Sequence, residues 1–346
     1  MVENIYSKII VGTGTSTFLT QDKSKDTIGT LEYSLKKGCG VHISPTYSNT
    51  FSKLSKIDLY KYTDSKVISK IDFDKQSNPE LQLELTSNLL KKRSFDVQIL
   101  IDFTKYFLNK ESNWYDFEKE LIYYKNKYSI SEFYLFPYYF DSEIFIDIIK
   151  DSKLNFNFAL LYSLLDREFK NLILDERKNG SKILAIKGFG GSLSNKYLNE
   201  NKSKSSCLHP INKSIDDLSR NLKLDEAKLR LIFSLKNPNI DFSCIAFSNY
   251  YQANEAFSII EKNFSPEIID SIITFGQRSY FEHKTALPEP RKIKKRFVNN
   301  HSFQSIFISC WRIDQRILSI KIISYSFCRN ILKTLRILKT KLNLKY

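Results

Sequence analysis

The sequence is poor in residues that build disulfide frameworks or structural zinc sites. It has five cysteines, an odd number, with no CxxC pair, and four histidines scattered over 346 residues. Small disulfide-bonded folds and zinc sites need cysteines or histidines at short, regular spacings. The sequence therefore disfavours both, and we expect no metal cofactor.

Long apolar runs are also missing. No stretch of about 18 uncharged apolar residues occurs, which argues against a membrane-spanning helix. The first ten residues, MVENIYSKII, include the acid Glu3 and lack the apolar segment of a signal peptide. We therefore expect a cytoplasmic protein. With 42% hydrophobic and 26% charged residues, the chain has enough apolar material for a core, which excludes the disordered and collagen-like classes.

The positive charge is concentrated at one end of the chain. Residues 291–346 contain 14 of the 53 Lys and Arg residues but only one of the 38 acids, so the rest of the chain has 39 basic and 37 acidic groups. Pro288-Glu289-Pro290 opposes a continuous helix and is followed directly by a basic run. We therefore predict a near-neutral domain over 1–290 and a basic tail over 291–346.

The tail has the pattern of a basic amphipathic helix. Apolar residues at spacings of 4, 3 and 4 share one face, and four basic residues share another (Ile331, Leu335, Leu338 and Leu342; Arg329, Lys333, Arg336 and Lys339). Such a helix binds an anionic membrane surface peripherally, or it docks on the domain with its lysines in solvent. Nucleic acid is a disfavoured partner, because no recognition motif accompanies the charge.

The body alternates short β-rich runs with helical patterns, which is typical of βα units around a parallel sheet. The helical patterns include Leu81, Leu85 and Leu89, a second helix that begins at Trp114, and one that follows Asp141 as its N-cap. Eight such steps over about 265 residues favour a closed α/β fold, the (β/α)8 TIM barrel, over a doubly wound sheet. The expected strands are 8–12, 41–43, 66–70, 96–101, 132–136, 156–161, 182–186 and 241–246.

Five segments, in order, resemble the aldo-keto reductase superfamily. LKKGCGVHISPTYS at 35–48 is similar to the passage A-G-x-x-x-x-D-T-A-x-x-Y-G, and VISK at 67–70 to the strand I-x-T-K. YSLLDRE at 162–168 is similar to Y-S-L-L-N-R-E, and IKGFGG at 186–191 to M-K-P-L-G-G. The last, IAFSN at 245–249 with Gln252 and Glu255, resembles G-M-S-N-x-x-Q-x-x-E.

The resemblance implies a barrel enzyme that reduces carbonyl compounds with NADP or NAD and uses an Asp, Tyr, Lys, His tetrad. In that family the tyrosine donates a proton to the substrate oxygen, the lysine lowers the pKa of the tyrosine, and the histidine orients the carbonyl. Tyr47 matches the tyrosine and Lys70 the lysine. His42 replaces the aspartate, and Ile101 or Asp102 stands where the histidine is expected. Beside a cationic Lys70, we expect His42 to be a neutral, hydrogen-bonded imidazole, and the alternative is that it replaces the missing acid.

The sequence matches the family pattern less well in the nicotinamide half of the implied cofactor site than in the phosphate half. Phe136-Pro137 and Ala159 replace the residues that hold the carboxamide of the nicotinamide, so that half is eroded. The phosphate half is better matched: three glycines allow close backbone approach, and the start of a helix offers N–H groups (Gly188, Gly190 and Gly191; Ser248, Asn249 and Gln252). Ala246 replaces a further glycine of the family pattern.

Three functions follow from these observations. The first is NAD(P)H-dependent reduction of a small carbonyl compound such as a sugar derivative, with Tyr47 as proton donor, Lys70 tuning it and His42 beside them. The second is a catalytically degenerate barrel that binds a ligand or acts as a scaffold. The third is a peripheral membrane or polyanion binder that works through its basic tail.

Overall fold

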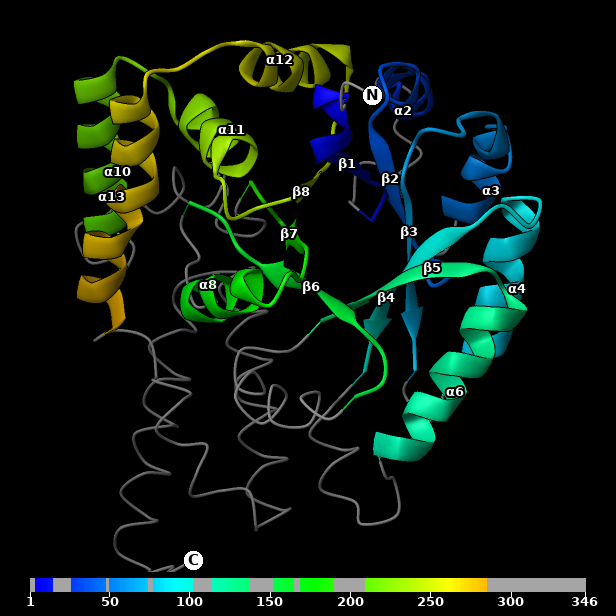
Figure 1. Cartoon of the computed structure of the whole chain (residues 1–346). Coiled ribbons are helices and arrows are strands. Elements are labelled where there is room, and N and C mark those ends of the chain that lie inside the picture. Colours follow the sequence, from blue (N-terminus) through cyan, green and yellow to red (C-terminus); the bar gives the residue numbers. More distant parts are fainter. Residues whose placement is uncertain are drawn as a thin grey trace, which may run out of the picture.

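Eight parallel strands pair in chain order and close into a barrel in the computed structural model (Figure 1). The structure describes residues 4–14, 26–47, 50–73, 77–101, 114–136, 152–164, 169–189 and 209–284. All eight strands lie where the sequence predicts them. They are β1 (Ile9–Gly12), β2 (Gly40–Ile43), β3 (Val67–Asp72), β4 (Phe95–Leu100), β5 (Ile130–Leu135), β6 (Phe156–Leu161), β7 (Ile183–Ile186) and β8 (Phe242–Ile245).

Helices surround the barrel and follow most of the strands. In order they are η1 (Ile5–Lys8), α2 (Thr27–Lys36), α3 (Thr50–Leu54), η2 (Leu59–Lys61), α4 (Pro79–Leu89), α6 (Trp114–Lys127), α8 (Lys170–Lys178), α10 (His209–Leu222), α11 (Glu226–Lys236), α12 (Tyr250–Glu261) and α13 (Pro266–Lys284). Capping side chains fix several starts: Asp26 accepts a hydrogen bond from Gly29 N, and Asp225 accepts one from Lys228 N. The helix expected after Asp141 lies outside the described residues.

The structure adds two details to the predicted helices. Leu81 and Leu85 lie on the exposed side of α4, with 50% and 44% of their surface accessible, while Leu83 and Thr86 are buried. The 4-residue leucine spacing therefore marks the helix but not its buried face. The segment before α11 contains a helix that the sequence pattern does not predict, α10, which packs beside α13 (Figure 1).

The barrel interior is arranged in layers of side chains, as expected where alternate residues of each strand point inward. Its central layer is apolar and fully buried, and it forms a cluster separate from the outer core (Ile10, Ile68, Tyr134, Ala159 and Leu184). The layer nearer the amino ends of the strands is charged. Lys66 Nζ lies 2.6 Å from Asp96 Oδ2 and 3.4 Å from Glu132 Oε2, and Lys182 also pairs with Glu132 through a contact of 2.5 Å. This end of the barrel is therefore closed by ion pairs.

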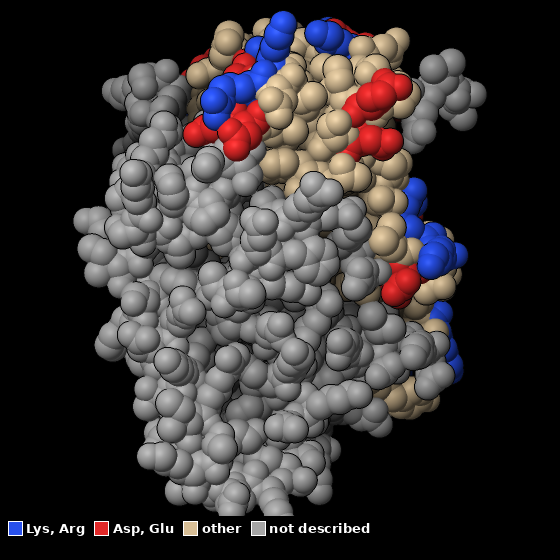
Figure 2. All heavy atoms as spheres, turned by 90° about the vertical axis from the view of Figure 1, so that its left-hand side faces the viewer, with Lys and Arg blue, Asp and Glu red and all other residues tan. Residues whose placement is uncertain are grey.

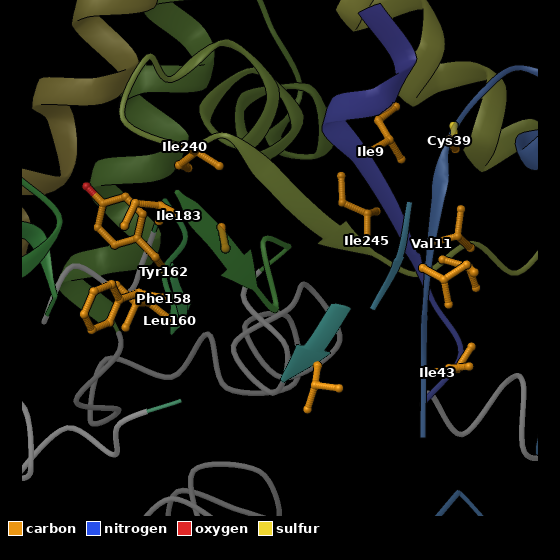
Figure 3. Packing of buried hydrophobic residues seen from close by; sticks show 14 of the residues in the cluster. Ile9, Val11, Cys39, Ile43, Phe158, Leu160, Tyr162, Ile183, Ile240 and Ile245 are labelled. Atoms are coloured by element: carbon orange, nitrogen blue, oxygen red, sulfur yellow. The ribbon is translucent and has the colours of Figure 1, made fainter. Parts of the chain in front are cut away.

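The larger core lies between the strands and the helices. Figure 3 shows side chains from several strands on this outer side, among them Val11, Ile43, Phe158 and Ile183. Tyr162 directly follows β6, and its ring lies 5.4 Å from the Phe233 ring of α11. Packing of this kind holds the helices against the barrel, so the interior is free to carry polar groups at its two ends.

The boundary predicted at Pro288 and the tail 291–346 lie outside the described residues. On the described part of the face in Figure 2, basic and acidic side chains lie next to one another. Within the described helices, none is both long and apolar enough to cross a membrane.

Candidate functional site

Polar side chains form the layer of the barrel nearest the carboxyl ends of the strands. Lys70 of β3 is in register with Gln98 of β4, and His42 of β2 is in register with Ile68. These three polar residues point into the barrel, as Ile68 and Tyr134 do. Lys70 and Gln98 each lie two residues closer to the carboxyl end of their strands than the registered pair Ile68 and Asp96. Barrel enzymes carry their active sites at this end.

Tyr47 is brought to the same rim by a turn that follows β2. Ser44 Oγ donates to the carbonyl oxygen of Lys70 at 2.9 Å, and Tyr47 N donates to the carbonyl oxygen of Ser44 at 3.1 Å. The ring of Tyr47 also packs against the backbone of Gly14, where an added Cβ would lie 2.6 Å from the ring. The turn and the glycine together fix the position of the phenol.

Tyr47 and Lys70, the two matched residues of the tetrad, are in contact. Lys70 Nζ lies 4.4 Å from the centre of the Tyr47 ring, a cation–π geometry over the face of the ring. Burial raises the pKa of Tyr47 and lowers the pKa of Lys70, although Asp72 acts in the opposite direction on the lysine. The resemblance implies that Lys70 lowers the pKa of the tyrosine, and burial acts on the same phenol in the opposite direction.

His42 is buried and bonded to a residue that sequence reasoning missed. Its Nε2 lies 2.5 Å from Oε1 of Gln98, and both side chains are almost fully buried. Burial lowers the pKa of His42 to about 4, the bond to Gln98 raises it, and Lys70 lowers it. The imidazole is therefore neutral near pH 7, the state expected from its position beside Lys70. The signal for Gln98 was present, because Asp96 and Gln98 are alternate polar residues in an otherwise apolar strand.

Cys244 of β8 adds a thiol to this layer. An added Cβ at Gly12 would lie 3.1 Å from Cys244 Sγ, so the glycine makes room for the sulfur. Burial raises the pKa of Cys244 to about 12, which keeps the thiol protonated. Cys39, on the outer side of the barrel, is also a free thiol.

The nicotinamide half of the implied cofactor site is filled by apolar side chains. Ala159 is fully buried in the central layer, and Phe136 packs against that layer. Ile101 is buried where a histidine is expected, whereas Asp102 and Pro137 lie outside the described residues. The described residues therefore offer no partner for a carboxamide at these positions.

The turn after β7 is held by α11. Ser234 Oγ donates to the carbonyl oxygen of Gly188 at 3.0 Å, and Arg230 donates to the carbonyl oxygen of Phe189 at 2.5 Å. A Cβ at Gly188 would lie 2.6 Å from Ser243 Oγ, so packing between β8 and α11 already requires a glycine here. Gly190 and Gly191 lie outside the described residues.

The start of α12 confirms the predicted helix but not an open anion site at Ser248. Asn249 caps the helix by accepting from Gln252 N at 3.1 Å, and the side chain of Gln252 accepts from Ser248 N at 2.7 Å. The N–H of Ser248, expected to face an anion, is therefore already paired. An anion can bind there only if the Gln252 side chain rotates away.

No group of three or more potential metal ligands occurs within the described part of the chain. Around Lys70 the described residues gather a phenol, an imidazole, an amide and a thiol, none of which carries negative charge near pH 7, while the carboxylate of Asp72 at the end of β3 acts on Lys70 through its charge. Such a set suits hydrogen bonding to an uncharged polar group such as a carbonyl oxygen.

Comparison with solved structures finds the same architecture. The crystal structure of a thermostable aldo-keto reductase in complex with the inhibitor epalrestat matches with a TM-score of 0.58 and 19% sequence identity, over 78% of this chain and 95% of that chain. No protein-family profile and no curated protein matches the sequence. The chain therefore has an aldo-keto-reductase-like (β/α)8 fold, as the resemblance implies.

Proposed function

We propose that this protein binds a small carbonyl compound, such as a sugar derivative, at the rim formed by Tyr47, Lys70 and His42, and reduces it slowly with NADPH or NADH. The observation that carries the proposal is the contact between Tyr47 and Lys70 at the carboxyl end of an aldo-keto-reductase-like barrel. The contact joins the two positions at which the family pattern has its tyrosine and lysine.

The rim residues have distinct roles in this proposal. The Tyr47 hydroxyl keeps its proton because burial raises its pKa, so it can donate a hydrogen bond and then a proton to the substrate oxygen. The ammonium of Lys70 stabilises negative charge that develops on that oxygen. His42, neutral and bonded to Gln98, orients the carbonyl as an uncharged hydrogen-bonding group.

The dinucleotide fits the described residues only in part. The capped start of α12 and the turn after β7 can hold its phosphates once Gln252 moves, with Gly190 and Gly191 continuing that turn in the sequence. The cofactor supplies a hydride when bound. Ala159 and Phe136 leave its carboxamide unpaired, and each unpaired polar group costs roughly 1 to 3 kcal/mol of binding free energy. We therefore expect weak dinucleotide binding.

Calorimetric titration with NADPH and NADH tests the cofactor. Heat of binding with an affinity weaker than that of an intact site is expected, and the absence of heat up to millimolar concentration would exclude the dinucleotide. Inorganic pyrophosphate is the matched probe for the phosphate half alone. Binding of pyrophosphate without the dinucleotides would indicate a phosphorylated ligand.

Oxidation of NADPH in the presence of small aldehydes tests the reaction. We expect slow turnover that falls by roughly 10²- to 10⁴-fold in Tyr47→Phe, because that change removes the proton donor. Tyr33→Phe is the control, since Tyr33 bonds Asn254 away from the rim. Equal turnover of Tyr47→Phe and wild type would show that Tyr47 is structural.

A second function, ligand binding without reduction, is favoured by two observations. The pKa of Tyr47 is raised, which slows proton transfer, and Ala159 stands where the family binds the nicotinamide. Binding of small aldehydes without turnover in the same assays would support it.

A further inference from the structure

Lys70 differs from the other lysines that point into the barrel. Lys66 and Lys182 are both ion-paired to carboxylates at the amino end of the strands. Within the described residues, no carboxylate lies within 4.0 Å of Lys70 Nζ, and its neighbour is the face of the Tyr47 ring at 4.4 Å. An ammonium that is partly removed from water and not directly ion-paired is less stable than one in solvent, and the charge of Asp72 offsets only part of this effect.

We propose that Lys70 is an imine-forming nucleophile whose Nζ attacks the carbonyl carbon of a small aldehyde or ketone at the barrel rim. This activity goes beyond the proposed reduction and needs no dinucleotide. A lysine in a desolvated site is the form of lysine that reacts with carbonyl compounds. The lowered pKa of Lys70, caused by burial, supports the geometric argument because it increases the neutral, nucleophilic fraction.

The step balances with the groups at the rim. The Nζ lone pair forms a bond to the carbonyl carbon, the π electron pair moves to oxygen, and a proton passes from nitrogen to oxygen to give a carbinolamine. The hydroxyl then leaves with the second nitrogen proton as water, and a C=N bond remains. Tyr47, which keeps its proton, can protonate the departing hydroxyl and recover the proton from nitrogen.

The other residues of this layer do not compete for the carbonyl carbon. The thiol of Cys244 stays protonated because burial raises its pKa to about 12, and a protonated thiol is a poor nucleophile. His42 is held by Gln98. Lys70 is therefore the strongest nucleophile that the described residues place at this rim.

Reductive trapping tests the proposal on the full-length wild-type protein. The protein is treated with butyraldehyde and sodium cyanoborohydride at pH 7 without dinucleotide, and the alkylated lysines are identified by peptide mass spectrometry. Lys91 and Lys119 are internal controls, because each places its Nζ over a tyrosine ring, at 3.7 Å and 4.1 Å, but on the surface. We expect the Lys70 peptide to be modified at least about tenfold faster than theirs.

Lys8 provides a second internal comparison. Burial lowers its pKa to about 8, but its ammonium donates to the carbonyl oxygen of Asn237 at 3.0 Å, and it precedes β1 at the amino end of the barrel. Lys70 is expected to react ahead of Lys8. Equal rates at Lys70 and the surface controls, or faster modification of Lys8, would overturn the proposal.

Lys70→Arg is the matched variant, because it keeps the cation over the ring but cannot form an imine. The butyl adduct should be absent from the peptide that contains residue 70, while modification of Lys91 and Lys119 is unchanged. Wild-type mapping decides the question even if this variant fails to fold. Because no dinucleotide is present, a negative result here leaves the reduction assay untouched, and absence of dinucleotide binding leaves this result untouched.

Discussion

At the scale of single residues, His42 stands where an aldo-keto reductase carries an aspartate, and the exchange changes the charge of the rim. A carboxylate would pair with Lys70, whereas a buried neutral imidazole adds no negative charge. Lys70 then rests on the Tyr47 ring instead of an anion. The reactivity that we propose for Lys70 follows from this one position.

The low pKa of His42 predicts a loss of stability in mild acid. The folded-state pKa is about 4 against 6.5 for a free histidine, so between these values the unfolded chain binds a proton that the folded chain does not. The free energy of unfolding should therefore fall as pH drops from about 6.5 towards 4, by up to roughly 3 kcal/mol. Urea unfolding at pH 7 and pH 5 measures it.

His42→Gln is the comparison variant, since glutamine does not titrate and can still bond Gln98. It is expected to be less stable at pH 7 but to lose less stability on acidification than wild type. Because Asp96 and Glu176 have raised pKa values from burial, they act in the opposite direction in both proteins, and the difference between the two slopes isolates His42. Equal slopes would mean that the histidine is already charged in the folded protein.

At the scale of secondary-structure elements, α11 holds the turn after β7 through a buried ion pair. The Arg230 side chain is 1% exposed and its partner Glu226 is 22% exposed, and the same guanidinium donates to the Phe189 carbonyl. A buried arginine on a barrel helix is costly unless all its donors are used. Here they fix the backbone from which the glycine-rich segment continues.

Arg230→Met is therefore expected to destabilise the protein by roughly 2 to 4 kcal/mol, because it removes the partner of Glu226 and of a carbonyl group. Arg220→Met is the matched control. Arg220 pairs with Asp217 on the surface of α10, with 75% and 49% of the side chains exposed, so its loss should cost less than about 1 kcal/mol.

Chemical unfolding of the two variants measures both values. The double variant Arg230→Met with Glu226→Gln should recover part of the loss, since it removes the carboxylate that Arg230 neutralised. Similar stability of Arg230→Met and Arg220→Met would show that the turn is held by Ser234 and packing alone.

The elements themselves could be predicted from the sequence far better than their contacts. All eight strands were visible, since each is a short apolar run bounded by polar residues. The exposed side of α4 cannot be predicted in this way, because Leu81 and Leu85 have the spacing of a buried face but lie in solvent. In the site, Tyr47 and Lys70 were found through matching residues, whereas their stacked geometry depends on packing around Gly14. The alternation of Asp96 and Gln98 marks Gln98 as inward-facing, but only the strand register places it beside Lys70.

At the scale of the whole molecule, charge is separated along the chain. The part before residue 291 is near neutral and its described helices carry mixed charges on the face shown in Figure 2. The tail carries 14 basic groups and one acid. A chain built in this way can bring the proposed carbonyl-binding rim to an anionic surface, without any change in the barrel.

We therefore predict that residues 291–346 bind anionic membranes. Each basic residue near such a surface contributes about 1 kcal/mol, and the apolar face of the predicted helix would add its buried area. The full chain should pellet with phosphatidylserine-containing vesicles at low salt, should be released by salt screening, and should remain in the supernatant with phosphatidylcholine alone. A chain ending at 290 should stay in the supernatant with unchanged circular dichroism. If this shorter chain is unfolded, or pellets as the full chain does, the tail belongs to the fold and the membrane prediction is wrong.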